Sequence, residues 1–235
     1  MKNSIFEYFA ELSKTNLSYT QKSGRYLIQK NQEKKIPKEI ISKMNLNKKD
    51  ELLEIGCGLG NLIIPLSKKV KKATGIDHPT ITQKIVQRKM SRKINLISGN
   101  FLKLNIKKKF DKILIYGVVH CLKNRRELNN FLSKSLKLMK KNGIILVGDI
   151  PNIDMKKRFL KSATGKKFEK KWQKNKKKEL SFNLKEFNNL ISFNDKLLTE
   201  LINRLRMKGY NAFLVPQNKN LPFSNTREDI IIKNE

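Results

Sequence analysis

The sequence that decides the fold reads Glu54-Ile55-Gly56-Cys57-Gly58-Leu59-Gly60, between an apolar run that ends there and a helical pattern that starts at Asn61. Glycines at this junction let the backbone turn tightly and approach a ligand, and the following helix offers its N-terminal amides. A phosphate-binding P-loop would continue with Gly-Lys-Ser/Thr, and a dinucleotide fingerprint would need glycine where Asn61 stands. The segment therefore favours a nucleotide-like ligand bound by neither of these two motifs. The alternative is a glycine-rich turn that binds nothing.

Outward from this segment, short apolar runs alternate with helical patterns, which is typical of βαβ units around a parallel sheet. The predicted strands are Glu51–Ile55, Ala73–Ile76, Ile94–Ile97, Lys112–Tyr116, Gly143–Gly148, Tyr210–Val215 and Asp229–Ile232. The predicted helices between them are Asn61–Lys68, Thr80–Met90, Arg125–Lys140 and Lys196–Lys208. The last two strands are separated by a short run of turn-forming residues, so we expect them to pair antiparallel.

The 235 residues are enough for one sizeable core, and we expect a single domain in four parts. Residues 1–47 are an N-terminal extension of two or three helices, interrupted near Gly24 and Pro37, and residues 48–150 form the ligand-binding core. Residues 151–195 are a basic helical cap inserted after the fifth strand, and residues 196–235 supply a helix and the strand pair. The predicted fold class is therefore α/β, a Rossmann-like three-layer sandwich with a mostly parallel seven-stranded sheet and an antiparallel C-terminal edge.

Polar side chains also follow the other predicted strands. Asp77 ends the second strand, Asn100 and Phe101 follow the third, and Tyr116-Gly117 end the fourth. A carboxylate beside the glycine-rich loop can accept hydrogen bonds from both hydroxyls of a ribose. Because the carboxyl ends of parallel strands meet at one edge of a sheet, these residues predict one crevice.

Together these motifs resemble the class I S-adenosylmethionine-dependent methyltransferases, over about Glu51 to Ile232. The resemblance implies S-adenosylmethionine as cofactor, with Asp77 on the ribose, Asn100 and Phe101 at the adenine, and the Glu54–Gly60 motif at the methionine. The full set of cofactor-binding residues that it implies is Glu54, Gly56, Cys57, Gly58, Gly60, Asp77, His78, Asn100, Phe101, Tyr116 and Gly117. Such families usually carry Asp where Asn100 stands, but an amide oxygen can also accept from the adenine amino group.

The acceptor is less closely defined by the sequence, because methyl transfer from a sulfonium mainly requires an aligned nucleophile. Enzymes of this fold that methylate exocyclic amines of bases usually carry Asn or Asp, Pro, Pro and an aromatic residue after the fourth strand, where this chain reads Tyr116-Gly117-Val118-Val119. The catalytic cysteine after proline, found in enzymes that methylate carbon 5 of pyrimidines, is also absent. Both nucleobase chemistries are therefore disfavoured.

His120 is the candidate general base, because it follows the fourth strand and its imidazole titrates near neutral pH. A packing role under the next helix is the alternative. Asp149 is the second catalytic candidate, because it could bind a substrate hydroxyl. A turn or capping role is the alternative. For Arg25 and Tyr19 of the N-terminal extension we favour surface positions, with closure over the cofactor carboxylate as the alternative.

The two cysteines and two histidines do not predict a metal site, because no C-x-x-C pair is present and neighbours in an extended segment point oppositely. We expect no metal and no thiol nucleophile, since no activating base stands beside Cys57 or Cys121.

The net charge of +32, from 52 Lys and Arg against 20 Asp and Glu, is typical of nucleic-acid binding when taken alone. Lys, Asn and Ile, which A/T-rich codons encode, are all abundant, so codon bias is the interpretation that we favour. The segment Lys156–Lys178 is harder to explain in this way, because it combines many lysines with Phe159, Phe168 and Trp172.

This basic cap admits two predictions about the acceptor. In the first, its aromatic residues are buried and close a pocket over a small-molecule, sugar or glycan acceptor. This prediction is favoured and agrees with a loose resemblance to bacterial methyltransferases of surface-polysaccharide or small-molecule pathways. In the second, lysines follow a phosphate backbone and exposed aromatics stack on bases, as in an RNA methyltransferase. A cofactor-binding protein without transferase activity is a further alternative.

No apolar run approaches the roughly 20 residues of a membrane-spanning helix, and Met1–Leu12 lacks the features of a signal peptide. We therefore expect a cytoplasmic protein whose cysteines need not pair. The sequence makes no prediction of the oligomeric state.

Overall fold

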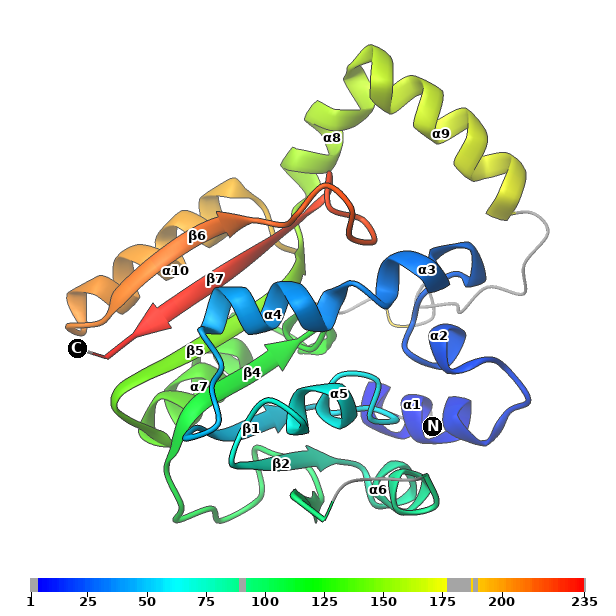
Figure 1. Cartoon of the computed structure of the whole chain (residues 1–235). Helices are drawn as coiled ribbons and strands as arrows, with labels where there is room; N and C mark the ends of the chain where they lie inside the picture. Colours follow the sequence, from blue (N-terminus) through cyan, green and yellow to red (C-terminus); the bar gives the residue numbers. More distant parts are fainter. Residues whose placement is uncertain (1–3, 89–91, 177–186, 188–189, 235) are drawn as a thin grey trace.

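A seven-stranded sheet with helices on both faces forms the body of the computed structural model, which describes residues 4–88, 92–176, 187 and 190–234 (Figure 1). The strand order is β3-β2-β1-β4-β5-β7-β6. The strands are β1 Glu51–Ile55, β2 Lys72–Asp77, β3 Ile94–Ser98, β4 Phe110–Tyr116, β5 Met139–Pro151, β6 Asn211–Pro216 and β7 Arg227–Lys233. Strands β3, β2, β1, β4 and β5 are parallel, and β7 pairs antiparallel with both β5 and β6. The predicted fold class and the antiparallel C-terminal edge are confirmed.

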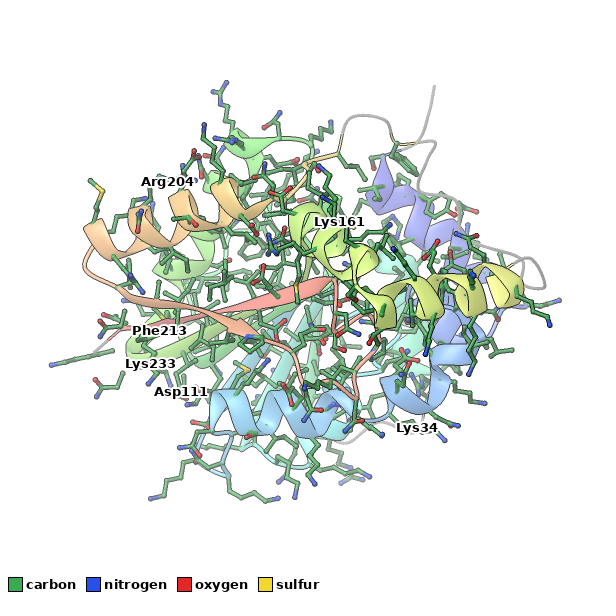
Figure 2. All side chains as sticks on the ribbon, turned by 90° about the horizontal axis from the view of Figure 1, so that it is seen from above. Lys34, Asp111, Lys161, Arg204, Phe213 and Lys233 are labelled. Atoms are coloured by element: carbon green, nitrogen blue, oxygen red, sulfur yellow. The ribbon has the colours of Figure 1, made fainter. Side chains whose placement is uncertain are left out.

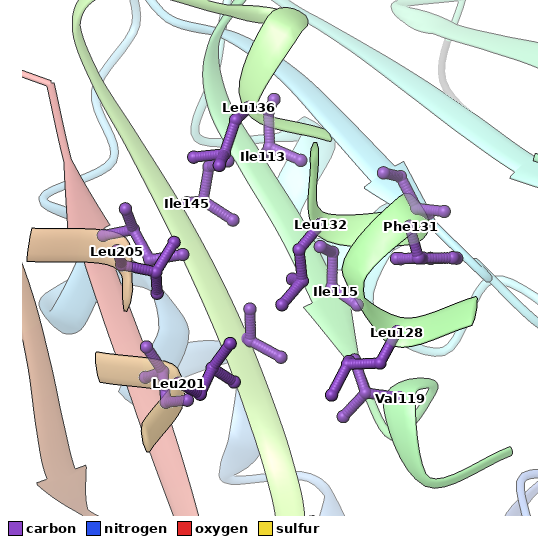
Figure 3. Packing of buried hydrophobic residues seen from close by; sticks show 14 of the residues in the cluster. Ile113, Ile115, Val119, Leu128, Phe131, Leu132, Leu136, Ile145, Leu201 and Leu205 are labelled. Carbon is purple, nitrogen blue, oxygen red and sulfur yellow. The ribbon is translucent and has the colours of Figure 1, made fainter. Parts of the chain in front are cut away.

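The two faces of the sheet bury two separate apolar cores. On one face, α7 (Arg125–Lys137) and α10 (Asp195–Met207) pack their leucines against Ile113, Ile115 and Ile145 (Figure 3). On the other face, α4 (Ile36–Met44), α5 (Ile63–Ser67) and α6 (Pro79–Val86) cover Leu52, Leu114 and Leu146. Alternate residues of one strand thus enter opposite cores, as the period of a strand requires. Burial of both faces explains why the central strands read as continuous apolar runs.

The N-terminal extension holds more helices than the two or three predicted. It contains α1 (Ile5–Lys14), α2 (Tyr19–Lys22), the 3-10 helix η1 (Leu27–Gln29), α3 (Lys30–Glu33) and α4. The prediction missed α2 and α3 because each is a single turn, too short to show a period. Pro37 lies in the first turn of α4, where its missing N–H costs no hydrogen bond, so it starts this helix as the predicted interruption implied.

The fifth strand begins earlier than predicted, and the predicted Arg125–Lys140 helix ends at Lys137. Met139 pairs with Phe110, and after a register shift Ile144 pairs with Lys112. The intervening turn contains Asn142 at a φ of 60°, whose N–H donates to the carbonyl of Asn234. Pairing with β4, which no local pattern reveals, therefore extends β5 to residues before the predicted start at Gly143.

The cap contains α8 (Ile153–Lys161) and α9 (Ala163–Lys176), which rise from the end of the sheet as an arm (Figure 1). None of the α8 residues is buried. Residues 177–186 and 188–189 of the predicted cap, which include Lys177, Lys178 and Phe182, lie outside the described residues. Within the described part of the chain, no helix is long and apolar enough to cross a membrane.

Candidate active site

The glycine-rich loop connects β1 to α5 at the carboxyl edge of the sheet. Gly56 has a φ of 77°, and a Cβ there would lie 2.5 Å from Cγ2 of Val118, so only glycine fits. Gly58 has a φ of 51° and no heavy atom within 4 Å of the place of a Cβ, so the loop opens towards free space at this point. The loop thus leaves backbone accessible beside the sheet, as the sequence predicted.

Asp77 lies directly against this loop. Its Oδ2 accepts from the N–H of Gly58 at 2.7 Å, and its Oδ1 accepts from the N–H of His78 at 2.7 Å. Burial raises the pKa of the Asp77 carboxyl, and the two backbone hydrogen bonds oppose this shift. A carboxylate held by two amides has a fixed orientation, and its remaining lone pairs can accept ribose hydroxyls.

His78 joins the N-terminal extension to the core. Its Nδ1 accepts from the N–H of Thr80 and caps α6, while its Nε2 lies 3.2 Å from Oε2 of Glu7. The Phe6 ring packs on the imidazole with 4.8 Å between centroids. Both ring nitrogens therefore have protein partners, and a contact of His78 with the cofactor stays a prediction.

The residues after β3 are largely occupied by their own neighbours. Oδ1 of Asn100 accepts from the N–H of Leu102 and forms a turn, and Phe101 is only 5% exposed in the core against Phe131. Phe101 therefore packs under the crevice. An adenine contact from this segment stays a prediction.

Tyr116 ends β4 and Gly117 follows it, both beside Gly148 of β5. A Cβ at Gly148 would lie 2.3 Å from the Tyr116 ring, so the glycine of β5 makes room for this side chain. The Tyr116 hydroxyl accepts from Nε2 of Gln217, and burial raises its pKa well above the ordinary value. The N–H of Gly117 donates to the carbonyl of Gly148 at 3.0 Å. Tyr116 is thus a neutral, fixed group beneath the site.

Asp149 is the centre of a buried ionic cluster. Its Oδ2 lies 2.9 Å from Nη2 of Arg25, and its Oδ1 lies 3.8 Å from Nε of Arg227. Although burial opposes ionisation, the two guanidinium groups hold the pKa of Asp149 below its ordinary value. Asp149 is therefore a buried carboxylate at neutral pH, where the sequence left a turn or capping role open.

The expected surface position of Arg25 is wrong. Its side chain is 8% exposed and spans from the N-terminal extension to the end of β5. The pairing of residues 124 positions apart gives no local sequence signal. Tyr19 does lie at the surface, half exposed, with the Arg88 guanidinium over its ring.

A second acid holds Asp149 in an unusual backbone conformation. Asp149 has a φ of 61°, and its N–H donates to Oδ1 of the fully buried Asp229. Asp229 also accepts from Nζ of Lys43 at 2.7 Å and from Nε2 of Gln217 at 2.8 Å. The sequence carries no signal for this network, because Asp149 and Asp229 are 80 residues apart. The left-handed conformation is maintained because hydrogen bonds over-determine it.

His120 follows β4 in the short helix η2 (Val119–Cys121), beside the Asp149 cluster. Burial and the charge of Arg227 lower its pKa to about 3, while the charge of Asp149 opposes this shift. The imidazole is therefore neutral at physiological pH. A group with this pKa is a weak base, so its chemistry here is to donate or accept hydrogen bonds.

Four polar atoms at this edge are buried without a hydrogen-bond partner in the described chain: Glu54 Oε2, His120 Nδ1, Asp149 Oδ1 and Gln217 Oε1. Such atoms are rare in folded proteins and point to a ligand that completes them. Burial and the nearby charge of Asp77 raise the pKa of Glu54 well above the ordinary value, so a cationic ligand group would favour its ionised form. This environment fits the ammonium and sulfonium charges of S-adenosylmethionine, and the ribose contact of Asp77 stays a prediction.

Among the described residues, neither the two thiols nor the side chains that commonly bind metals form a second candidate site. Burial raises the pKa of Cys57 well above its ordinary value and that of Cys121 to about 12, so neither is an activated nucleophile. Among the described residues, no three His, Cys, Asp or Glu side chains are grouped so that they could hold a metal ion.

Comparison with known proteins agrees with this geometry. A profile of the family "Ribosomal RNA adenine dimethylase" matches residues 13–174. The chain belongs to this family. The resemblance to class I S-adenosylmethionine-dependent methyltransferases is thereby confirmed, and S-adenosylmethionine is the cofactor.

Individual relatives match shorter parts. The chain is 38% identical over 94 residues to ribosomal RNA small subunit methyltransferase A of Wigglesworthia glossinidia brevipalpis, covering 36% of this chain and 35% of the relative. It is 33% identical over 109 residues to a probable methyltransferase of the same name from Methanosphaera stadtmanae, covering 44% of this chain and 38% of the relative. The chain thus spans little more than a third of the length of the curated relatives that it matches.

The fold extends further than the sequence similarity. The N-methyltransferase NodS from Bradyrhizobium japonicum, solved with S-adenosyl-L-homocysteine, superposes with a TM-score of 0.64 and 13% identity. The match covers 99% of each chain, so the N-terminal extension and the C-terminal strand pair are included in the shared fold.

Proposed function

We propose that this protein is an S-adenosylmethionine-dependent methyltransferase whose acceptor is RNA. The observation that carries the proposal is the match of the ribosomal RNA adenine dimethylase family to residues 13–174, which include the glycine-rich loop, Asp77 and Asp149. This match favours an RNA acceptor over the small-molecule or glycan acceptor that the sequence favoured.

The basic surface supports the same acceptor. In the described part of the arm, Lys166, Lys167, Lys170, Lys171 and Lys174 are all exposed. Lysines on an exposed helix can follow a phosphate backbone and release its counterions on binding. A charge that codon bias alone could produce thus lies on an arm beside the crevice.

The cofactor supplies an electrophilic methyl group on a sulfonium, and in this proposal the protein orients the acceptor. The unpartnered Oδ1 of Asp149 accepts a hydrogen from the nucleophilic nitrogen and aims its lone pair at the methyl carbon. His120 Nδ1 provides a second buried hydrogen-bonding atom on the same side of the site. Transfer would form a C–N bond and break the C–S bond of the cofactor, and the extra proton on the nitrogen would leave to water, because Asp149 is held ionised by two guanidinium groups.

Asp149 and His120 are assigned this role because the motif usual for amine methylation is absent. The tetrapeptide after β4 reads Tyr116-Gly117-Val118-Val119, and Val119 is 1% exposed in the apolar core. This segment offers neither the side-chain amide nor the aromatic ring of the usual motif. Asp149 and His120 are therefore the groups that we assign to the nucleophile.

The test is transfer of labelled methyl from S-adenosylmethionine to a small-subunit ribosomal RNA transcript, to total RNA and to a glycan and metabolite fraction of the same cells. We expect nuclease-sensitive label, with RNA affinity falling steeply as salt rises. The Asp149→Asn variant is the matched control, since it binds cofactor but transfers slowly. Label confined to glycan or metabolite material would instead support the acceptor class first predicted from the sequence.

A further inference from the structure

Five aromatic side chains form a continuous row from the arm to the body of the protein. We call this set the aromatic row, and its members are Phe159, Phe168, Trp172, Tyr26 and Phe223. Phe168 and Trp172, one turn apart on α9, stack with 5.7 Å between ring centroids and 15° between planes. Trp172 then contacts Tyr26 of the N-terminal extension at 4.7 Å and Phe223 of the β6–β7 connection at 5.5 Å.

The inner end of the aromatic row reaches the buried acid of the site. The Arg227 guanidinium lies 5.2 Å from the centroid of Phe223, and its Nη1 donates to the carbonyl of Asp149 at 2.9 Å. Tyr26 follows Arg25, which binds the Asp149 carboxylate. The row therefore runs from the exposed arm to the residues that hold Asp149.

The outer end of the row remains open to solvent. Phe168 is 41% exposed, Trp172 and Phe159 are half-buried, and α8 has no buried residue. Figure 2 shows the arm from above, with Lys161 on it and Lys34 on the same side of the molecule. Phe168 is thus exposed among lysines and Phe159 and Trp172 are only half-buried, whereas the sequence predicted burial of all three rings.

We propose that the aromatic row stacks on nucleobases of single-stranded RNA and guides one base towards Asp149. This inference rests on the proposed RNA acceptor. It goes beyond it by naming the side chains that take the place of the aromatic ring absent after β4. The ring that amine methyltransferases of this fold usually place after the fourth strand is Val119 here, so stacking must come from another element. The aromatic row offers flat rings beside exposed lysines, and this combination of stacking and phosphate contacts is what single strands require.

The single tryptophan of the chain makes the row directly observable. Stacking of a base on Trp172 or on its neighbours should quench the intrinsic fluorescence. The titration uses a single-stranded RNA oligonucleotide and, for comparison, an oligomer of the same length with abasic ribose phosphates. We expect strong quenching by the RNA and weak quenching by the abasic strand, whereas a binding surface made only of lysines would treat both strands alike.

Variants of one exposed ring separate stacking from apolar contact. Phe168→Ala and Phe168→Leu should each weaken binding of the labelled oligonucleotide by about 5- to 100-fold, because leucine restores bulk but no flat face. Phe168→Tyr should restore binding. Phe213→Ala is the control, because Phe213 is similarly exposed at 44% but lies on β6 at the opposite end of the molecule (Figure 2).

The outcomes distinguish this inference from the proposed function. If RNA binds and is methylated while fluorescence and affinity are indifferent to bases and to Phe168, the stacking role is wrong and the RNA acceptor stands. If the wild-type protein neither binds nor methylates RNA, the proposed function fails first. If Phe168→Leu binds as tightly as the wild type, the row is an apolar contact and the inference is likewise overturned.

Discussion

The two ends of the parallel strands carry similar numbers of charged groups but satisfy them differently. At the amino end, Glu51 pairs with Lys108 at 2.7 Å and with Lys140 at 3.2 Å, and Asp111 also pairs with Lys140. At the carboxyl end, Glu54 and Asp149 each leave one buried oxygen without a hydrogen-bond partner. Both ends belong to the same sheet, so membership of the sheet does not explain why charged groups are paired at one end and left incompletely hydrogen-bonded at the other.

The difference indicates which end is built for a ligand. Partly exposed ion pairs such as those of Glu51 contribute little to stability and nothing to recognition. A buried oxygen without a partner costs about 1–3 kcal/mol, and this cost is offset when a ligand supplies the missing donor. The carboxyl end is therefore less stable alone and more responsive to binding than the amino end.

The largest expected effect comes from Asp149→Asn. Asparagine adopts positive φ readily and has nearly the same shape, so the backbone at this position should be retained. Loss of the carboxylate removes the group assigned to the nucleophile, and we expect turnover to fall about 100-fold with cofactor affinity within a few-fold of wild type. Single-turnover kinetics with saturating cofactor measure this. An unchanged rate would remove Asp149 from the reaction.

Asp77→Ala should weaken cofactor binding by about 10- to 100-fold, the effect of losing one or two charge-assisted hydrogen bonds. Titration calorimetry with S-adenosylhomocysteine measures this. Asp77→Asn is the matched variant, because its amide oxygen can still accept from the N–H of Gly58 or His78. Equal affinity in all three proteins would show that Asp77 only holds the loop.

The amount that could be predicted from sequence differs between these two acids. Asp77 was assigned correctly to the loop because its position follows from a strand end and a glycine motif, both of which are local signals. The partners of Asp149 come from three distant segments, through Arg25, Arg227 and Asp229. No period or spacing encodes such contacts, so the sequence found the residue but not its environment.

The same contrast applies to the fold. The strands of the sheet were predicted to within a few residues, the central ones because burial on two faces leaves clear apolar runs. The single-turn helix α2 and the early start of β5 were missed, because a capping pair at Ser18 and Gln21 and a cross-strand pairing at Met139 determine them. At Met139 a tertiary contact overrode the local pattern, whereas the Ser18–Gln21 pair is a local capping signal that the prediction overlooked.

The pH dependence of stability should report His120 directly. The unfolded chain binds a proton at this residue near pH 6.5 and the folded protein only near pH 3. Between these values the unfolded state holds more protons, so acidification lowers the free energy of unfolding. In His120→Gln this contribution disappears, and its stability should fall less steeply with acid than that of the wild type. Denaturant melts at several pH values test this, and parallel curves would contradict the assigned environment.

The smallest effects should come from a matched pair at the two ends of β1, Glu54→Gln and Glu51→Gln. Because burial raises the pKa of Glu54 well above that of the unfolded chain, its ionisation lowers stability as pH rises. Glu54→Gln should therefore raise the melting temperature of the free protein at neutral pH by about 2–4 °C while weakening cofactor binding. Glu51→Gln breaks satisfied, partly exposed pairs, so it should change stability by less than about 1 kcal/mol and leave cofactor binding intact. If both variants lost stability and kept affinity, the carboxyl end would be as fully satisfied as the amino end, and the contrast between them would not mark a ligand site.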